Sequence, residues 1–292
     1  MKAMFVTTET CDTTNHVRAF ESAFGEVEHY RFDHTGIRND WKIIETAERV
    51  RPQAIFYIGA NCAPGIPKPD TLKALRNIAP TVNLCSDAAD SPWHSVLAFY
   101  RCNGCFDLQV SIDGAKDVVD LSTLTPVDSR PFDAINVERD IRSGFSGTVG
   151  RWNSRSEMVL ALKWFGGLTV RDREGDGTYE DHVRFLKRCK ILLNISITGS
   201  GRLHHIKGRV LEAGWAGCAL LESDGSPIND WFPSDCYFLY RNPKEASDII
   251  ESISDEEILR AAKRLSEEVR KRFRPEQIYG EMLKRVGLRT SA

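Results

Sequence analysis

The sequence has no apolar run of about 20 residues, the length that a membrane-spanning helix needs. It also has no block of like charges, because 39 Lys and Arg residues nearly balance 41 Asp and Glu residues, for a net charge of −2. Binding to nucleic acid or to an anionic membrane through bulk charge is therefore not expected, although the balanced charge is compatible with a local basic pocket. The apolar start at residues 1–6 is too short for a secretory signal and is typical of a buried strand. We expect a cytoplasmic protein.

Closely spaced cysteines are almost absent, since only Cys102 and Cys105 of the eight lie near each other. A structural zinc site would need a second close pair of Cys or His, and none follows at a suitable distance. A thioredoxin-type pair is the other interpretation, but this pair precedes an apolar strand-like run instead of opening a helix. We expect structural or incidental thiols in a reducing compartment, and no metal site.

At 292 residues the chain is about twice a typical domain length, and short apolar runs alternate with helical patterns along it. In the first part we expect strands at residues 3–7, 27–32, 54–59, 81–85 and 106–112. Helices are predicted between them at residues 15–23, 41–50, 69–78 and 93–102. Such alternation is typical of a mostly parallel sheet covered on both faces.

The alternation of apolar runs and helical patterns stops between residues 120 and 140. Two prolines and the lack of periodicity there predict a linker. A second alternation follows, with strands expected at 143–146, 168–170, 191–195, 218–222 and 237–240, and helices at 154–164, 179–188, 206–216 and 243–252. Ser254 and Glu257 then form a capping-box pattern ahead of a long helical stripe. We predict an α/β protein with two tandem Rossmann-like domains, 1–130 and 131–255, and C-terminal helices at 256–292 that pack back across them.

The most informative stretch, residues 204–221, predicts a helix with Lys207, Arg209 and Glu212 in its first turns, then a glycine turn into a buried strand. Exposed N–H groups and the macrodipole make a helix N-terminus favourable for an anion. Two cations and a carboxylate suit a nucleoside diphosphate, whose pyrophosphate needs positive charge and whose ribose offers two hydroxyls. The alternative is a solvated helix on which Arg209 and Glu212 form a surface pair.

Several short segments occur in an order that is known from one group of enzymes. They are residues 87–93 (DAADSPW), 125–128 (TPVD), 144–150 (GFSGTVG), 207–213 (KGRVLEA), 217–221 (GCALL) and 240–246 (YRNPKEA). Over residues 80–255 the chain resembles GT-B glycosyltransferases, most closely the CgeB-like proteins and related transferases of family-1 or family-4 type. The resemblance implies sugar transfer from a nucleotide-sugar donor, with a UDP-sugar expected, in a cleft between the domains. It implies no metal and no other cofactor.

The resemblance also implies a set of donor-binding residues. They are Ser146, Gly147, Thr148, Arg155, His204, Lys207, Arg209 and Glu212. The backbone of residues 146–148 would face the donor phosphates, Lys207 and Arg209 would neutralise the leaving diphosphate, and Glu212 would hold the ribose. His204 departs from the pattern, because many GT-B enzymes carry a Glu eight positions before the ribose-binding one, beside the donor sugar. An exposed loop residue is the other interpretation of His204.

An inverting reaction would also need a general base for the acceptor hydroxyl. Asp87, Asp90 and His94 follow the fourth predicted strand, at the sheet edge where α/β proteins bind ligands, and are our catalytic candidates. The same residues are typical of turns and helix caps. Glu9 and His34, each just beyond a strand, are further candidates.

Three functions stay open on this basis. The first is a glycosyltransferase whose acceptor is a saccharide, a lipid-linked sugar, a protein or a modified DNA base. The second is a nucleotide-sugar epimerase of the same architecture. The third is a degenerate nucleotide-sugar-binding protein that has lost turnover. No oligomeric state is predicted.

Overall fold

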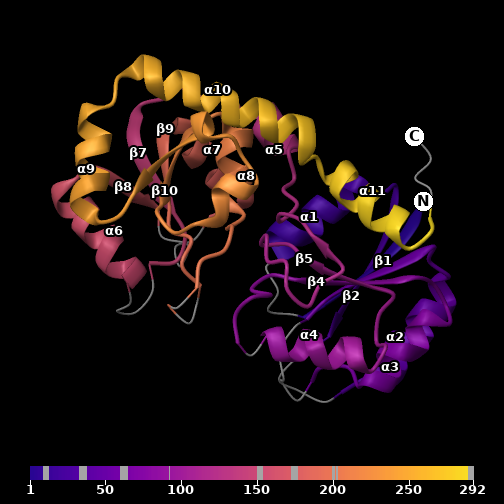
Figure 1. Ribbon diagram of the computed structural model, residues 1–292. Coiled ribbons are helices and arrows are strands. Elements are labelled where there is room, and N and C mark those ends of the chain that lie inside the picture. The colour runs from indigo at the N-terminus through magenta and orange to yellow at the C-terminus, as the bar shows by residue number, and fades with distance from the viewer. Residues whose placement is uncertain are drawn as a thin grey trace. The chain divides into compact units, whose positions relative to one another are not determined.

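The computed structural model describes residues 1–8, 13–32, 38–59, 65–91, 93–149, 154–171, 177–198, 201 and 203–288. The chain divides into two compact units (Figure 1). The first unit combines Met1–Asp128 with Pro275–Ala292, and the second is Ser129–Arg274. The chain therefore leaves the first unit near the predicted boundary at residue 130 and returns to it at Pro275, within the segment predicted as C-terminal helices.

The first unit is built on a six-stranded sheet with the order β2-β1-β3-β4-β5-β6. Its strands are β1 (Lys2–Thr8), β2 (Glu26–Phe32), β3 (Ala54–Ile58), β4 (Thr81–Cys85), β5 (Leu108–Ser111) and β6 (Leu121–Ser122). Its helices are α1 (Thr13–Ala23), α2 (Asp40–Val50), α3 (Pro69–Arg76), α4 (Trp93–Cys102) and α11 (Pro275–Arg285). Every strand pairing is parallel, as helical crossovers between strands require.

Alternate residues of the central strands in the first unit face two different helical layers. On one face Phe5 and Phe56 pack with Phe20 of α1, and the ring of Tyr279 on α11 stands edge-on to Phe20 and Phe56, with centroids 5.3 and 5.5 Å away. On the other face Tyr57 and its neighbours pack with apolar residues of α2, α3 and α4. The last described helix of the chain thus completes the core that the first strand begins.

The second unit is a five-stranded parallel sheet with the order β11-β10-β9-β7-β8. Its strands are β7 (Ile141–Ser146), β8 (Leu168–Arg171), β9 (Cys189–Asn194), β10 (Ala219–Ser223) and β11 (Tyr237–Tyr240). Its helices are α5 (Arg130–Ala134), α6 (Ser154–Phe165), α7 (Tyr179–Arg188), α8 (Arg209–Ala216), α9 (Pro243–Ser252) and α10 (Asp255–Arg272). Helices α6 and α9 pack together over one face of the sheet, and α7 and α8 over the other (Figure 1). These two parallel sheets confirm the predicted α/β fold of two Rossmann-like halves.

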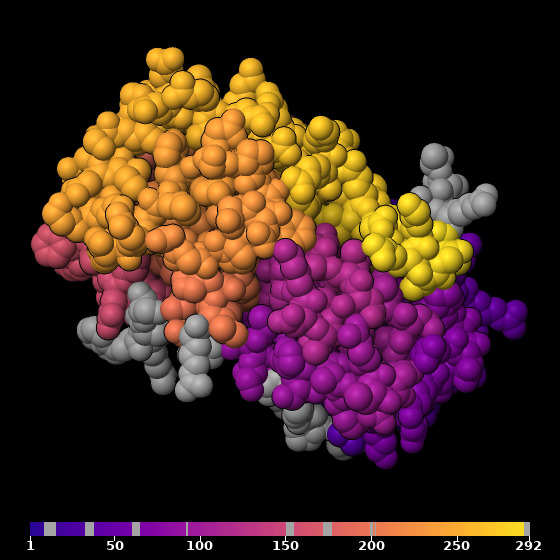
Figure 2. Space-filling view, in the orientation of Figure 1, coloured from indigo at the N-terminus to yellow at the C-terminus, as the bar shows by residue number. Residues whose placement is uncertain are grey.

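Helix α10 begins where the capping pattern predicts. The Ser254 hydroxyl accepts a hydrogen bond from the backbone N–H of Glu257, and the Glu257 carboxylate accepts one from the N–H of Ser254. The helix then packs on α8 and β10 with its apolar stripe, and it forms part of the gold surface of the second unit in Figure 2.

The predicted linker at 120–140 contains more regular structure than the sequence indicates. Strand β6 adds to the sheet edge, because Leu121 pairs in parallel with Val110 of β5. Helix α5 carries Pro131 in its first turn, where a missing N–H costs nothing, and buries Phe132. Two residues of strand and five of helix are too short to produce a periodic pattern, so the sequence alone does not indicate them.

In the part of the chain that the structure describes, no helix is long and apolar enough to cross a membrane. The described cysteines are all free thiols: Cys85, Cys102, Cys105, Cys189, Cys218 and Cys236. Cys102 is exposed and Cys105 is buried, so the two thiols of the close pair are not presented together at the surface. Cys11 and Cys62 lie outside the described residues.

A close approach of two helices in the second unit depends on Gly214 of α8. A Cβ at this position would lie 2.8 Å from Cβ of Val269 on α10 and would collide with its Cγ2. We expect Gly214→Ala to destabilise the protein by about 1–3 kcal/mol, because overpacking against a stiff Val outweighs the better helix propensity of Ala. Urea unfolding measures this difference. Gly25→Ala, which meets nothing within 4 Å, is the matched control, and equal stability of the two variants would contradict the packing.

Candidate functional site

Polar residues gather at the carboxyl ends of three neighbouring strands in the second unit. Ser146 ends β7, Asn194 ends β9, and Glu222 and Ser223 end β10, and all four are buried. Asn194 and Glu222 each follow a run of apolar residues that fills the sheet interior. Because all four are buried, each polar group must find a partner away from water. This edge of a parallel sheet is also where α/β folds bind ligands.

Arg209, the first residue of α8, connects two of these strand ends. Its Nη1 donates to Oδ1 of Asn194 at 3.0 Å, and its Nη2 donates to the carbonyl oxygen of Ser146. The guanidinium lies over the ring of Phe145, 4.5 Å from the ring centroid. Burial lowers the pKa of Arg209 to about 10, with Glu212 opposing the shift and Arg155 adding to it. The side chain is therefore a positioned cation at neutral pH, and these two bonds use only two of its five N–H groups.

Gly147 makes the position of Arg209 possible. A Cβ at this residue would collide with Nη2 of Arg209, and the φ angle of +153° is one that other residues rarely adopt. The N–H of Gly147 donates to the carbonyl oxygen of Arg171 at 3.2 Å. That N–H is engaged within the unit, so Gly147 contributes space for the guanidinium rather than a donor for phosphate.

Glu212 lies in the first turn of α8 and is only 7% exposed. Its Oε1 lies 3.0 Å from Nε2 of His182 on α7, and the other ring nitrogen, Nδ1, lies 3.0 Å from the Ser146 hydroxyl. Residues 210–216 of α8 are all buried, so the alternative of a solvated surface helix is wrong. His182 was not identified from the sequence, although it shares the inward helical face with Tyr179, Val183 and Leu186.

Glu222 is the most enclosed carboxylate of the site. It is the ladder partner of Asn194, whose Nδ2 donates to Oε2 of Glu222 at 2.7 Å. Its Oε1 accepts from the backbone N–H of Ser223 at 2.9 Å and from the Ser223 hydroxyl at 3.2 Å. Burial raises the pKa of Glu222 to about 7, although these hydrogen bonds act in the opposite direction. A carboxylate directly after an apolar strand is the signal by which the sequence could have revealed it.

The remaining predicted donor-binding residues all lie in the second unit. Thr148 is exposed just beyond β7, and Arg155 is partly buried on α6. Lys207 lies before α8, because the helix begins at Arg209 instead of residue 206 as predicted. His204 forms an isolated bridge with Ile197, and its Nδ1 lies 2.9 Å from the Ser196 hydroxyl. Burial and the neighbouring His205 lower the pKa of His204.

The catalytic candidates share one turn of the first unit, after β4. Asp87 has a φ angle of +99°, and its backbone N–H donates to Oδ2 of Asp113 at 2.9 Å. Asp90 is buried, and its backbone carbonyl oxygen accepts from the N–H of His94, whose side chain is exposed. Glu9 and His34 lie outside the described residues.

Asp113, which the sequence did not single out, holds this turn in place. It is 2% exposed and lies two residues after the end of β5. Oδ2 accepts from the N–H groups of Asp87 and Ala88, and Oδ1 accepts from the Ser111 hydroxyl and the Ala115 N–H. A buried carboxylate with four donors fixes a backbone conformation that Asp87 alone would not prefer.

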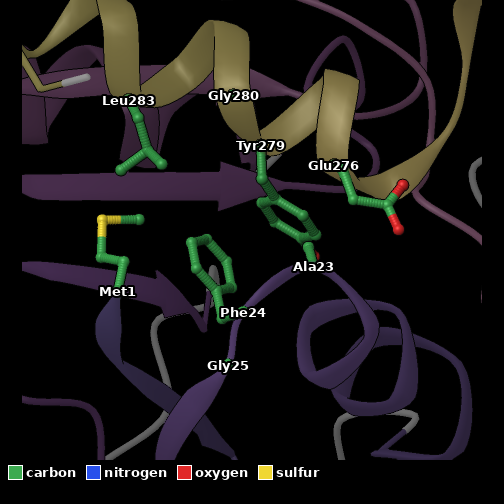
Figure 3. A pocket seen from close by; sticks show the side chains of 8 residues that line it. All are labelled: Met1, Ala23, Phe24, Gly25, Glu276, Tyr279, Gly280 and Leu283. Carbon is green, nitrogen blue, oxygen red and sulfur yellow. The ribbon is translucent and has the colours of Figure 1, made fainter. Parts of the chain in front are cut away.

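The pocket in Figure 3 lies at the other end of the sheet in the first unit. Met1 and Gly25, which line it, precede β1 and β2, and Tyr279 and Leu283 of α11 point into it. Glu276 points away from the pocket (Figure 3). Because this is the amino end of the strands, the pocket is not where the fold places a ligand.

Two parallel Rossmann-like sheets with polar strand ends define the GT-B architecture. Residues 132–284 match the model of a family described as "Glycosyl transferase-like", which is more than half of the chain. The chain belongs to this glycosyltransferase family, and the predicted resemblance is confirmed.

Solved structures share the fold at low sequence identity. HepE of Anabaena, in complex with UDP, matches with a TM-score of 0.66 at 11% identity, covering 97% of this chain and 100% of its own. An alpha-glucosyltransferase in complex with UDP-glucose and DNA containing an abasic site has a TM-score of 0.65 at 9% identity, covering 99% and 100%. A glycosyltransferase from Rickettsia africae has a TM-score of 0.64 at 9% identity, covering 98% and 97%. No curated protein matches the chain in sequence.

The raised pKa of Glu222 makes stability depend on pH. Because the folded-state value of about 7 lies above the ordinary value of 4.5, folding takes up a proton, and the free energy of unfolding falls as the pH rises between them. In the unmodified protein we expect Glu222 to lower the free energy of unfolding by about 3 kcal/mol between pH 4.5 and pH 8. Glu222→Gln should remove this decrease. Urea unfolding at both pH values measures it. Glu256→Gln, at an exposed position of α10, should keep the slope of the unmodified protein, and an unchanged slope in Glu222→Gln would contradict the assignment.

Proposed function

We propose that the protein transfers a sugar from a nucleoside-diphosphate sugar, with a UDP-sugar as the expected donor, to an acceptor hydroxyl. The observation that carries the proposal is the placement of Arg209 and Glu212 one helical turn apart at the carboxyl ends of β7 and β9. Family membership sets the reaction class. The UDP and UDP-glucose bound by the solved structures of the same fold support a uridine nucleotide.

The chemistry of the donor side follows from charge. Breaking the anomeric C–O bond leaves additional negative charge on the diphosphate, so cations that are already in place stabilise the transition state. Asn194 and the Ser146 carbonyl hold the Arg209 guanidinium, and its remaining N–H groups can meet a phosphate without reorganisation. Arg155 and Lys207 add positive charge, and we propose that no metal is needed. Glu212, oriented by His182, accepts hydrogen bonds from the ribose hydroxyls.

On the acceptor side we propose Asp87 as the general base. Its backbone strain is typical of residues whose position matters more than their stability, and Asp113 maintains it. Asp90 is less suited, because its side chain is buried and its backbone belongs to the turn that begins α4. His94 is exposed near the start of α4 and is the second choice.

The donor site predicts the effect of two substitutions. Arg209→Ala and Glu212→Ala should each weaken UDP binding by about 10- to 100-fold, because each removes a charged hydrogen-bond partner of the ligand. Isothermal titration with UDP measures this, and Arg184→Ala, on the exposed side of α7, is the control. Unchanged affinity in both variants would remove the donor-site assignment.

A turnover assay separates this proposal from the other two functions. UDP-, GDP-, ADP- and dTDP-sugars are incubated with and without saccharide, lipid-linked, peptide and DNA acceptors, in the presence of EDTA. Nucleoside diphosphate released only with an acceptor supports a metal-independent transferase. Isomerised donor without an acceptor indicates an epimerase, and binding without turnover indicates a degenerate site.

The role of Asp87 can be distinguished from a structural one by Asp87→Gly. Turnover should fall by about 100-fold or more through loss of the base. The free energy of unfolding should stay equal or rise by about 1 kcal/mol, because glycine adopts the φ angle of +99° without strain. Arg51→Gly, which relieves a φ angle of +50° at the end of α2, should gain stability and keep its turnover. Full turnover in Asp87→Gly would exclude Asp87 as the base.

A further inference from the structure

The buried carboxylate of Glu222 is separated from the Arg209 guanidinium by a single side chain. Asn194 accepts from Nη1 of Arg209 at 3.0 Å with its Oδ1, and it donates to Oε2 of Glu222 at 2.7 Å with its Nδ2. Because arginine only donates, this orientation of the amide is fixed. Glu222 is 0% exposed, whereas Arg209 is partly exposed. A ligand can therefore touch the guanidinium, and it cannot touch the carboxylate.

The groups that bond to Glu222 are all neutral. Besides the amide described above, the backbone N–H of Ser223 donates to Oε1 at 2.9 Å, the Ser223 hydroxyl lies 3.2 Å from Oε1, and the Ser196 hydroxyl is a further side-chain partner. Arg209 is the cation that senses this carboxylate. Burial lowers the pKa of Arg209, and attraction to Glu212 and to Glu222 opposes the shift. The charges of Arg209 and Glu222 are thus coupled across one amide.

Glu222 can take up a proton while the strand ends keep their places. The added hydrogen lies on Oε1 and points to the Ser223 hydroxyl, which is able to accept as well as to donate. The Ser223 hydroxyl then donates in turn to the Ser196 hydroxyl, 2.7 Å away, or to the Tyr240 hydroxyl, which is its other side-chain partner. The two protonation states therefore differ in charge and not in the position of any side chain.

The charge of Glu222 changes what Arg209 offers to a diphosphate. An ionised carboxylate cancels part of the positive field of the guanidinium and repels the negative phosphates, and a neutral carboxyl group does neither. A diphosphate at Arg209 therefore binds more tightly to the protonated form. By linkage, the bound diphosphate favours protonation of Glu222 by the same factor.

We propose that Glu222, acting through Asn194 on Arg209, is a positioning residue that couples donor binding to a proton. The donor diphosphate binds at Arg209 as the Glu222 carboxylate takes up one proton from solvent. The proton leaves again when the diphosphate leaves, and no other bond forms or breaks. This inference rests on the proposed function, because it requires the diphosphate at Arg209. It makes a residue that no ligand touches a determinant of donor affinity.

Other ionisable groups face this pair of charges. Next to Glu222, burial is the main cause that raises the pKa of Tyr237 and of Tyr240, so both stay neutral. The charged groups that act on Arg209 besides Glu222 are Glu212 and Arg155.

Two histidines lie one hydrogen bond away from this set. His182 is bonded to Glu212, and His204 is bonded to Ser196. Burial is the main cause that lowers the pKa of His204, whereas burial raises the pKa of Glu222 to about 7. The test must therefore identify the carboxyl group itself, and it must span the range between pH 6 and pH 8.5.

Isothermal titration of the full-length protein with UDP-glucose at pH 6 and pH 8.5 tests the inference. UDP-glucose is the probe because its diphosphate is esterified at both ends and does not titrate in this range, unlike the terminal phosphate of UDP. We expect binding to be about three- to tenfold tighter at pH 6. Two buffers of different ionisation enthalpy should also reveal proton uptake near neutral pH. Equal affinity at both pH values, or tighter binding at pH 8.5, would overturn the inference.

The variant Glu222→Gln removes the charge at every pH. It should bind UDP-glucose equally at the two pH values, and more tightly than the unmodified protein does at pH 8.5. A merely structural role of Glu222 would instead weaken binding at both pH values and keep their ratio. Glu256→Gln, at an exposed position of α10, is the matched control and should keep the dependence on pH.

A spectroscopic measurement on the unmodified protein keeps the test decisive if Glu222→Gln does not fold. Carbon-13 NMR follows the carboxyl carbon of Glu222, assigned through its bonds to the backbone. This carbon should titrate at a higher pH with UDP-glucose bound than without it, by the same factor as the change in affinity. If a histidine were the source of the proton uptake, the titration of the Glu222 carboxyl group would stay where it is, and the inference would be wrong.

Failure of the proposed function has a different signature. If UDP-glucose binds at neither pH, or binds Arg209→Ala as tightly as the unmodified protein, the proposed donor site is wrong and this inference falls with it. Binding that depends on Arg209 and not on pH overturns the inference alone and leaves the proposed function in place.

Discussion

The Arg209 guanidinium is held between the Ser146 carbonyl and the Asn194 amide. It fixes how the polar side chains at the strand ends of the second unit are oriented. By occupying Oδ1 of Asn194, it forces the amide nitrogen toward Glu222 and thereby orients the carboxylate. The same cation rests on Phe145 and fills the space that Gly147 leaves open. One charged group thus links β7, β9 and α8, and its partners are all fixed before any ligand arrives.

The two units use their strand ends in different ways. In the second unit the polar groups form two sets, one around Glu212 and His182 and one around Glu222, and Ser146 and Arg209 lie between them. In the first unit a single carboxylate, Asp113, holds a strained turn by accepting from backbone N–H groups. The second unit thus holds its polar side chains by bonds to one another, whereas the first unit uses a carboxylate to hold backbone.

Apart from β6, the fold was predictable because strands 4–7 residues long alternate with helices that have clear caps and stripes, as at Ser254. The site was only partly predictable. Arg209 and Glu212 lie close together in the sequence, so their spacing indicates a shared function. His182, Asn194 and Glu222 come together through strand register and the crossing of α7 with α8, and neither is encoded in local spacing. The role of Gly147 depends on a side chain 62 positions away, which no local motif contains.

The helix that begins at Pro275 has a consequence for the order in which the protein takes shape. The ring of Tyr279 lies among Phe20, Phe24 and Phe56, so the aromatic core of the first unit lacks one wall until the last part of the chain is available. The second unit, by contrast, is one uninterrupted stretch. During synthesis on the ribosome the second unit can therefore be finished first, and the first unit must wait until α11 has been made.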